Sequence, residues 1–277
     1  MYIYKLTIKL KCFILFVCFF FVFMQKFQNM KVLTFDHCQY LTHIPNVSGL
    51  PNLENLSFEK CCNLITIDSS IGYLNKLEIL NAKECTKLKS FPPLQLASLR
   101  ELELSFCKSL KSFPELLCEM KNIKVIVLSD TSLELPLSFQ YLCKLHCFRI
   151  DRGGTVRFPK SNDKMYPMVL SNVSDLILYK SNLSDECLPI LLKCCVNVKN
   201  LNLTGNNFKI LPECLSECQL LKILYLNDCK SLVEIRGIPP NLKELSAIRC
   251  ESLSSSSRRM LLSQVCCCCF IALVFDI

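Results

Sequence analysis

Apolar residues recur along the middle of the chain in one repeated pattern, L-x-x-L-x-L-x-x-C-x-x-L. One copy reads Leu53, Leu56, Phe58, Cys61 and Leu64. Ten copies can be aligned, and their first apolar residues stand at positions 30, 53, 77, 99, 123, 145, 173, 198, 221 and 242. Successive copies therefore start 21 to 28 residues apart. A sustained period of this length indicates a solenoid of stacked repeats.

Within each copy, the alternation of apolar and polar residues predicts a short β-strand, because successive side chains of a strand point to opposite faces. Leu56 and Phe58 would point into the coil, whereas Asn55, Ser57 and Glu59 would point out. One copy cannot bury its apolar row alone, so neighbouring copies stack and share a core. We predict an α/β solenoid, a leucine-rich-repeat horseshoe of about ten repeats with a concave parallel β-sheet.

The segments that return from one strand to the next carry a proline after an apolar residue, as in Phe91-Pro92, Phe113-Pro114 and Leu211-Pro212. Proline interrupts both helices and central strands. The pattern therefore predicts a mostly irregular convex side with short helical turns.

Six cysteines occupy one position of the pattern, the position that many such repeats fill with Asn. These residues are Cys38, Cys61, Cys85, Cys107, Cys229 and Cys250. The side chain at this position turns inward after the strand, and Cys is small and apolar enough to fill the space. We predict a ladder of buried structural thiols rather than disulfides or metal ligands. Since the chain has 21 Cys in all, complete intramolecular pairing is impossible, and unpaired thiols favour a reducing compartment.

Two apolar segments flank the repeats. Residues 12–24 follow three lysines and are too short for a bilayer span, which needs roughly 20 apolar residues. They have the length of a signal-peptide core but lack a small-residue cleavage site. We predict an N-terminal extension over 1–28 (a signal, an anchor or sequence that belongs to no domain), a leucine-rich-repeat domain over 29–264 and a Cys-rich apolar tail over 265–277. Membrane association is expected only through residues 12–24.

Charge and motifs narrow the function. Lys and Arg number 32 and Asp and Glu 24, a net charge of +8 that is scattered and forms no basic stripe with interleaved aromatics, so we expect no nucleic-acid binding. Phosphate-binding, dinucleotide-binding, zinc-protease and hydrolase motifs are missing from the sequence. His37 and His43 flank Cys38 without the usual spacing of zinc ligands. We therefore expect no enzymatic activity, no cofactor and no metal.

Function is then expected on the outward strand residues. The first half of this surface is more acidic, and the second half mixes basic and aromatic residues. The candidate protein-binding residues are Glu59, Lys83, Glu101, Glu103, Phe106, Arg149, Asp151, Tyr179, Asn202, Tyr225 and Asn227. Phe106, Tyr179 and Tyr225 are candidate aromatic anchors, although they could equally cover neighbouring strands. The irregular stretch Arg152–Pro167, which produces the 28-residue step, is a candidate specificity loop.

Residues 53–115 and Cys250–Gln264 resemble plant intracellular immune receptors of the nucleotide-binding, leucine-rich-repeat class with a Toll/interleukin-receptor-type N-terminus. The resemblance covers about 29–264, the leucine-rich-repeat portion only. It implies a cytoplasmic, non-catalytic module that senses pathogen effectors or guarded host proteins and restrains the receptor. Its expected partners are an effector, a host protein or other receptor domains. No residues match the signalling and nucleotide-binding domains, so we expect a truncated receptor.

Two other interpretations stay open. A secreted or membrane-anchored leucine-rich-repeat protein would bind an extracellular ligand, and five N-x-[ST] sequons are compatible with it. Plant proteins of that kind usually carry N-x-L-x-G-x-I-P repeats and paired-Cys caps, which this sequence lacks. A ubiquitin-ligase adaptor would need an F-box-like helical start, and residues 1–30 do not resemble one.

Overall fold

A computed structural model describes residues 5–7, 27–152, 155–157, 170–264 and 270–272 of the 277-residue chain. The chain divides into two compact units. Unit 1 comprises residues 1–144 and 156–159, and unit 2 comprises residues 145–155 and 160–277. Five of the ten repeat starts fall in each unit, so each unit is a stack of coils in its own right.

Unit 1 contains a five-stranded parallel sheet in the order β1-β2-β4-β6-β7. Its strands are β1 (Lys5–Thr7), β2 (Val32–Thr34), β4 (Asn55–Ser57), β6 (Ile79–Asn81) and β7 (Glu101–Glu103). The register places Leu33 opposite Leu56, and Leu56 opposite Leu80. Equivalent residues of successive repeats therefore lie side by side.

The rest of unit 1 consists of short elements on the return segments and one further strand. These elements are β3 (His43–Ile44), β5 (Thr66–Ile67), β8 (Val125–Ser129), β9 (Ser132–Glu134) and the 3-10 helices η1 (Ser69–Tyr73) and η2 (Leu137–Tyr141). Strands β3 and β5 pair in parallel. Asp68 caps η1 by accepting a 2.9 Å hydrogen bond from the Ser70 N–H. Strand β11 (Thr155–Arg157) lies where the chain passes between the units.

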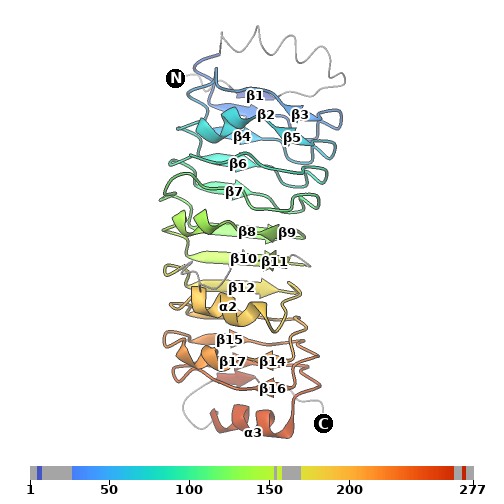
Figure 1. The fold of residues 1–277 in the computed structure, drawn as a ribbon, viewed down its shortest axis with the longest axis vertical. Helices are drawn as coiled ribbons and strands as arrows, with labels where there is room; N and C mark the ends of the chain where they lie inside the picture. Colours follow the sequence, from blue (N-terminus) through green and yellow to red (C-terminus); the bar gives the residue numbers. More distant parts are fainter. Residues whose placement is uncertain (1–4, 8–26, 153–154, 158–169, 265–269, 273–277) are drawn as a thin grey trace. The chain divides into compact units, whose positions relative to one another are not determined.

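Unit 2 repeats the arrangement with a parallel ladder through β10, β12, β13, β15, β17 and β18. These strands are β10 (Cys147–Asp151), β12 (Asp175–Tyr179), β13 (Asn200–Asn202), β15 (Ile223–Tyr225), β17 (Glu244–Ser246) and β18 (Phe270–Ala272). The return segments carry α2 (Cys187–Cys194), β14 (Ile210–Leu211), η3 (Glu213–Glu217), β16 (Glu234–Ile235) and α3 (Ser255–Gln264). Figure 1 shows the strands stacked in sequence order within each unit.

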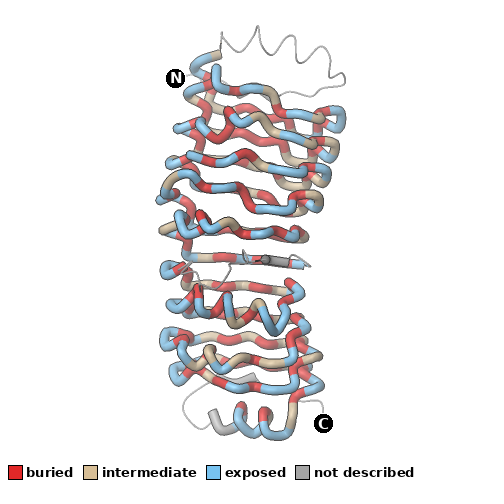
Figure 2. Tube along the Cα trace, in the orientation of Figure 1, coloured by how far each residue is buried: buried red, intermediate tan, exposed pale blue. Residues whose placement is uncertain are grey.

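The core is the row of apolar side chains that the repeat pattern predicts. Leu33, Leu56 and Leu80 are fully buried in unit 1, as are Leu201 and Leu224 in unit 2. Buried and exposed residues alternate along each coil (Figure 2). The predicted leucine-rich-repeat solenoid, with parallel strands and few helices, is thus confirmed. In α2, Leu188, Leu191 and Leu192 have the spacing of one helix face and are buried.

One backbone feature recurs in every coil. The residue just before the Cys or Asn position has a left-handed conformation, with φ between 49° and 73°. These residues are His37, Lys60, Glu84, Phe106, Asp130, Arg152, Lys180, Gly205, Asp228 and Arg249. Only one of them is glycine, although the left-handed region costs other residues about 1 kcal/mol or more. The stack of coils therefore imposes this turn on residues that would not adopt it alone.

Several sequence expectations fall on residues outside the described ranges. Residues 12–24, most of the tail over 265–277 and residues 153–154 and 158–169 of the candidate specificity loop are among them. The domain boundaries at 28 and 264 likewise stay predictions. Among the helices in the described ranges, none combines the length and apolar character that crossing a membrane requires.

Candidate functional site

The candidate surface is the exposed face of the strands and of the turn that follows each strand. Glu101 and Arg149 are exposed, and nearly all the other predicted residues are half-buried. Side chains in neighbouring strands of a parallel sheet stand in rows, so contacts run from one repeat to the next. The face is therefore partly pre-organised by its own polar contacts.

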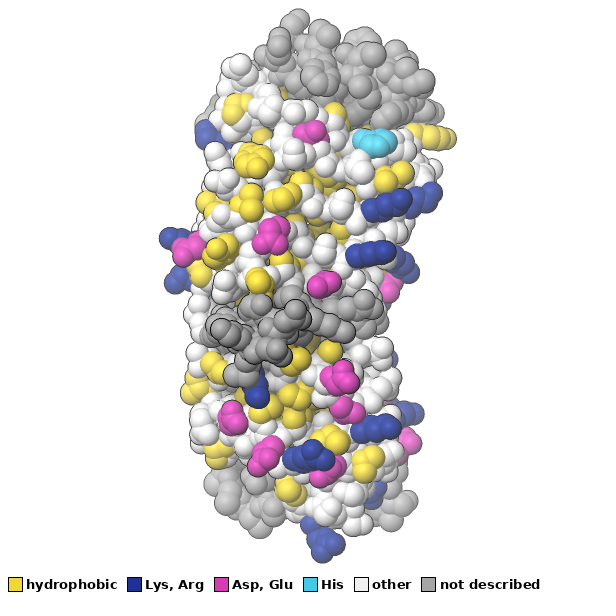
Figure 3. Space-filling model, in the orientation of Figure 1, with side chains coloured by type: hydrophobic (Ala, Val, Ile, Leu, Met, Phe, Trp, Pro, Cys, Tyr) yellow, Lys and Arg dark blue, Asp and Glu magenta, His cyan; other side chains and the backbone are white. Residues whose placement is uncertain are grey.

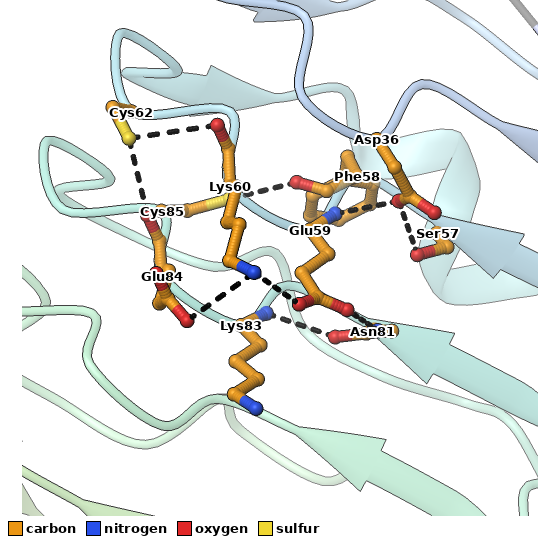
Figure 4. A network of polar contacts seen from close by, with 10 residues as sticks. All are labelled: Asp36, Ser57, Phe58, Glu59, Lys60, Cys62, Asn81, Lys83, Glu84 and Cys85. Atoms are coloured by element: carbon orange, nitrogen blue, oxygen red, sulfur yellow. Dashed lines mark hydrogen bonds and ion pairs between the residues drawn. The ribbon is translucent and has the colours of Figure 1, made fainter.

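In unit 1 these contacts begin at Asp36, which follows strand β2. Its carboxylate Oδ1 accepts hydrogen bonds from the Ser57 hydroxyl at 2.5 Å and from the Glu59 N–H at 2.8 Å. Both donors belong to the next repeat. Asp36 is thereby held in place, and it fixes the backbone beneath the candidate residue Glu59 (Figure 4).

The network continues into the third repeat through Glu59. Its Oε2 accepts a hydrogen bond of 3.2 Å from the Asn81 amide, whose Oδ1 accepts from the Lys83 N–H at 3.0 Å. Lys60 Nζ lies 3.4 Å from Glu59 Oε1 and 4.0 Å from Glu84 Oε1. Three repeats thus present one connected set of charged and polar groups.

Unit 2 builds the equivalent network with an amide. Asn227 holds the place of Asp36, and its Oδ1 accepts from the Ser246 hydroxyl at 2.6 Å and from the Ile248 N–H at 2.9 Å. Nearby, the Tyr225 hydroxyl donates to Glu244 Oε1 at 2.6 Å. This hydrogen bond to a carboxylate raises the pKa of Tyr225. Tyr225 therefore presents a fixed, neutral phenol on the sheet face.

Asp151 differs from the other candidates because it is not an outward group open to solvent. It is only 8% exposed. Arg149, two residues earlier on the same face of β10, covers it and places Nε 2.6 Å from Asp151 Oδ2. A ligand would therefore meet Arg149, and the expectation that Asp151 itself is accessible is corrected.

The two other candidate aromatics are half-buried. Phe106 has a left-handed backbone with φ 64°, a strained conformation for a bulky residue. The Lys180 ammonium lies 5.2 Å from the centre of the Tyr179 ring, within the range of a cation–π contact. Both residues keep part of their surface exposed.

The Cys positions form a ladder of thiol–carbonyl contacts beneath this surface. Cys61 donates to the Phe35 carbonyl at 3.2 Å, and Cys85 donates to the Phe58 carbonyl at 3.1 Å. Cys107, Cys229 and Cys250 repeat the contact at 3.0 to 3.2 Å. In every case the acceptor lies three residues before the equivalent position of the preceding repeat. All six ladder residues, Cys38 included, are at most 3% exposed.

Burial makes these thiols chemically inert. It raises the pKa of Cys61, Cys107 and Cys229 to about 12 and that of Cys250 to about 11. The thiolate is the nucleophilic and metal-binding form, and it is suppressed here at any physiological pH. The fifteen Cys within the described ranges are all free thiols. In the same part of the chain, no three His, Cys, Asp or Glu residues gather as metal ligands would.

The sequence did not single out a hollow of about 560 Å³ in unit 1. Arg100, Glu101, Leu102 and Glu103 of the fourth repeat line it on one side, and Asn122, Lys124, Val125 and Val127 of the fifth repeat on the other. Its signal in the sequence is a change of repeat type. The fourth repeat reads Cys107-x-x-Leu110, whereas the fifth reads Thr131-x-Leu133.

Charged side chains of both signs are interspersed on the face that Figure 3 shows. The exposed large apolar residues include Tyr73 and Tyr141 on the 3-10 helices of unit 1 and Ile190 on α2 of unit 2. Neither positive nor negative charge therefore dominates the face of either unit that Figure 3 shows.

Known proteins similar in sequence are plant disease resistance proteins. Disease resistance-like protein DSC1 of Arabidopsis thaliana is 32% identical over 69% of this chain and 16% of its own length. Disease resistance protein RPP4 of the same plant is 31% identical over 80% of this chain and 19% of its length. TMV resistance protein N of Nicotiana glutinosa is 27% identical over 74% of this chain and 24% of its length.

Solved structures with a similar fold are leucine-rich-repeat proteins at low identity. The leucine-rich-repeat domain of the type III effector XopL is 20% identical, with 84% of this chain and 73% of that chain covered and a TM-score of 0.46. The functional domain of InlJ from Listeria monocytogenes is 14% identical, with 83% and 55% covered and a TM-score of 0.42. No protein-family model matches the chain.

The chain spans between 16% and 24% of the length of these three plant relatives. The similarity thus concerns only a part of each of those proteins. The described residues form a leucine-rich-repeat solenoid, and the sequence relatives of these repeats are plant disease resistance proteins of the Toll/interleukin-receptor-type, nucleotide-binding, leucine-rich-repeat class.

Proposed function

We propose that this chain is a non-catalytic protein-recognition module of the plant immune-receptor type, and that it binds a protein partner on the exposed face of its sheet. The observation that carries the proposal is the set of polar contacts that the side chains of Asp36, Glu59 and Asn81 make across three repeats. Such contacts hold side chains in place before binding, which lowers the entropic cost of association.

The composition of the face supports a protein partner. Acidic Glu59 and Glu101, basic Lys83 and Arg149, and aromatic Tyr225 are mixed along it. Interfaces between proteins combine aromatic and Arg anchors with charged rims. The relatives suggest the kinds of partner: a pathogen effector, a guarded host protein or other domains of a receptor that the repeats hold inactive.

The free thiols support a cytoplasmic location for this function. Fifteen unpaired cysteines in the described ranges suit a reducing compartment better than an oxidising one. A tagged full-length chain and a version lacking residues 1–28 should both stay unglycosylated in plant cells, with no mobility change after glycosidase treatment. A glycan shift that depends on residues 1–28 would favour the secreted or membrane-anchored alternative.

The binding proposal is tested with matched variants of the full chain in plant cells. Lys83→Glu with Tyr225→Ala alters one sheet-face residue in each unit, and Lys193→Glu with Tyr141→Ala makes the same changes on the return segments. Proteins that co-purify with each chain are quantified by mass spectrometry. We expect the sheet-face variant to lose a specific partner about tenfold and the control to retain it. Equal retention by both variants would refute the proposal.

A further inference from the structure

The sheet of unit 1 is interrupted between β7 and β8. Strand β7 is the last strand of its sheet, and within the described residues no ladder joins it to β8. Figure 1 shows β8 set apart from β7, whereas β6 and β7 lie side by side. The hollow of about 560 Å³ lies at this interruption.

The hydrogen bonds show where the ladder opens. At earlier repeats, two successive N–H groups donate to one carbonyl of the preceding repeat. Arg100 and Glu101 both donate to the Glu78 carbonyl, at 2.8 and 3.0 Å. The equivalent donors of the fifth repeat are Lys124 and Val125, and they make no such bond to the Arg100 carbonyl in the described structure. Both edges of the opening thus carry unpaired backbone groups.

The far end of the two strands stays closed through different contacts. The Ser105 hydroxyl donates to the Val127 carbonyl at 3.4 Å and accepts from the Ser129 N–H at 3.1 Å. The Phe106 N–H donates to the Ser129 carbonyl at 2.6 Å. The strands are therefore held together at one end and open at the other, which makes the hollow a built feature of the fold.

The side chains of the hollow indicate what it binds. Val125 is 49% exposed on its wall, and the neighbouring Lys124 is exposed as well. Arg100 is paired with Glu78 at 3.5 Å, and Lys124 shares the lining with Glu101 and Glu103, so the site has no excess of positive charge and does not suit a polyanion. Unpaired backbone groups beside an apolar side chain and both charges suit an extended peptide, which offers N–H, C=O and mixed side chains.

We propose that the hollow between β7 and β8 binds an extended peptide segment of the protein partner. Backbone groups of that segment would pair with the Arg100 carbonyl and the Lys124 and Val125 N–H groups. An apolar side chain of the segment would cover Val125, with an acidic neighbour directed to Lys124. This inference rests on the proposed function and locates its specificity at one junction.

Amide hydrogen exchange on the full chain tests the geometry without any ligand. The amides of Lys124 and Val125 should exchange at least about tenfold faster than those of Arg100 and Glu101, because only the latter pair is hydrogen-bonded in the ladder. Equal protection of the two pairs would mean that the ladder is closed, and the inference would fail.

Ligand binding is tested with a random-peptide display library selected against the full chain. Enriched peptides should lose at least about tenfold in affinity on Val125→Arg but not on Ile79→Arg, which changes the equivalent position of β6. They should also protect the Lys124 and Val125 amides from exchange. Thermal melting checks that both variants are folded, and Lys124→Glu serves as a second variant.

The outcomes separate this inference from the broader proposal. Peptides unaffected by Val125→Arg and Lys124→Glu, or no enriched peptide at all, would overturn the hollow as a peptide site. Neither result would affect the partner lost on Lys83→Glu with Tyr225→Ala, because those residues do not line the hollow. If that partner is retained while selected peptides bind at Val125, the sheet-face proposal is refuted and the hollow stands as a peptide site.

Discussion

Three thiol coils of unit 1 and the Asn206 coil of unit 2 fill the same position of the repeat with different chemistry, although Cys229 and Cys250 of unit 2 keep the thiol. In unit 1, Cys61, Cys85 and Cys107 follow one another and each thiol donates to the preceding coil. In unit 2, Asn206 takes the position and donates from Nδ2 to the Leu178 carbonyl at 2.6 Å and to the Leu203 carbonyl at 2.8 Å. Its Oδ1 also accepts from two N–H groups of the preceding coil.

A third solution, a hydroxyl, occurs once in each unit. Thr131 and Ser181 are 3% and 1% exposed, and neither hydroxyl has a hydrogen-bond partner within the residues that the structure describes. A carbon–sulfur bond is longer than a carbon–oxygen bond, so a thiol reaches the carbonyl of the preceding coil where a hydroxyl does not. The comparison indicates that the Cys or Asn position of the repeat favours an inward hydrogen-bond donor long enough to reach a carbonyl of the preceding coil.

The largest expected difference between thiol and amide coils is a loss of folding stability at high pH, which only the thiol coils contribute. Folded Cys61, Cys107 and Cys229 have a pKa of about 12, whereas a thiol in the unfolded chain ionises near 9. Unfolding above pH 9 therefore releases protons, and stability that is complete below pH 9 is lost as the pH rises. We expect the free energy of unfolding to fall by about 1 kcal/mol per ladder thiol at pH 10.

Urea titrations at pH 8 and pH 10 measure this loss. The control is Cys107→Ala. This variant has one ladder thiol fewer, so its unfolding free energy should fall less between pH 8 and pH 10, by the contribution of that one thiol. An unfolding free energy that is the same at both pH values would contradict buried, protonated thiols.

The amide coil is expected to be most sensitive to a single truncation. Asn206→Ala removes the side-chain partner of two buried N–H groups and of the Leu178 carbonyl, and leaves the Leu203 carbonyl with the Cys229 thiol. Unsatisfied buried groups cost about 1–3 kcal/mol each before relaxation, so we expect a loss of about 3–5 kcal/mol in denaturant unfolding. Asn202→Ala, at a half-buried site on β13, should cost far less. Similar losses for both would show that the contacts of Asn206 are unimportant.

A thiol coil should be destabilised when a hydroxyl replaces its buried thiol, although the two groups differ by one atom. Cys85→Ser replaces the long thiol with a hydroxyl that falls short of the Phe58 carbonyl, and we expect a loss of about 1–3 kcal/mol. Exposed Cys62 gives the matched control, since Cys62→Ser should be nearly neutral. Chemical denaturation of both variants measures the difference in unfolding free energy. If Cys85→Ser leaves that free energy unchanged, the longer reach of the thiol is not the reason that Cys occupies this position.

The smallest expected effect is a gain in stability. Thr131→Val keeps the shape of the side chain and removes a buried hydroxyl without a partner, so stability should rise by about 1 kcal/mol. Thr86→Val is the control, because the Thr86 hydroxyl donates to the Cys62 carbonyl at 3.3 Å and its removal brings no gain. Thermal melting compares the two, and a loss on Thr131→Val would mean that the hydroxyl is satisfied.

The sequence predicted the features that depend on periodicity. The Leu rows and the parallel strands follow from residues that recur in phase, such as Leu33, Leu56 and Leu80, and the inward placement of the ladder cysteines follows from their fixed place in the repeat. These features need no knowledge of contacts between distant residues. The fold is therefore encoded locally and repeated along the chain.

Features that depend on the contacts between two particular repeats could not be predicted from the sequence. Asp151 is buried and its Oδ2 is paired with Arg149, and the opening beside Val125 lies where two repeat types meet. The left-handed turns fall on Lys60, Phe106 and other residues that do not favour them. Stacking decides all three features, and single-residue preferences do not reveal it.

The most direct test of the account is cross-linking from the sheet face. A photo-reactive amino acid is placed in the full chain at Asn202 or Glu59 on the sheet face, or at Gln140 or Lys193 on the return segments, in plant cells. The account predicts that one protein partner is cross-linked from the sheet-face positions and not from the return segments. Cross-linking from Gln140 and Lys193 alone, or equally from all four positions, would contradict a recognition module that binds through its sheet.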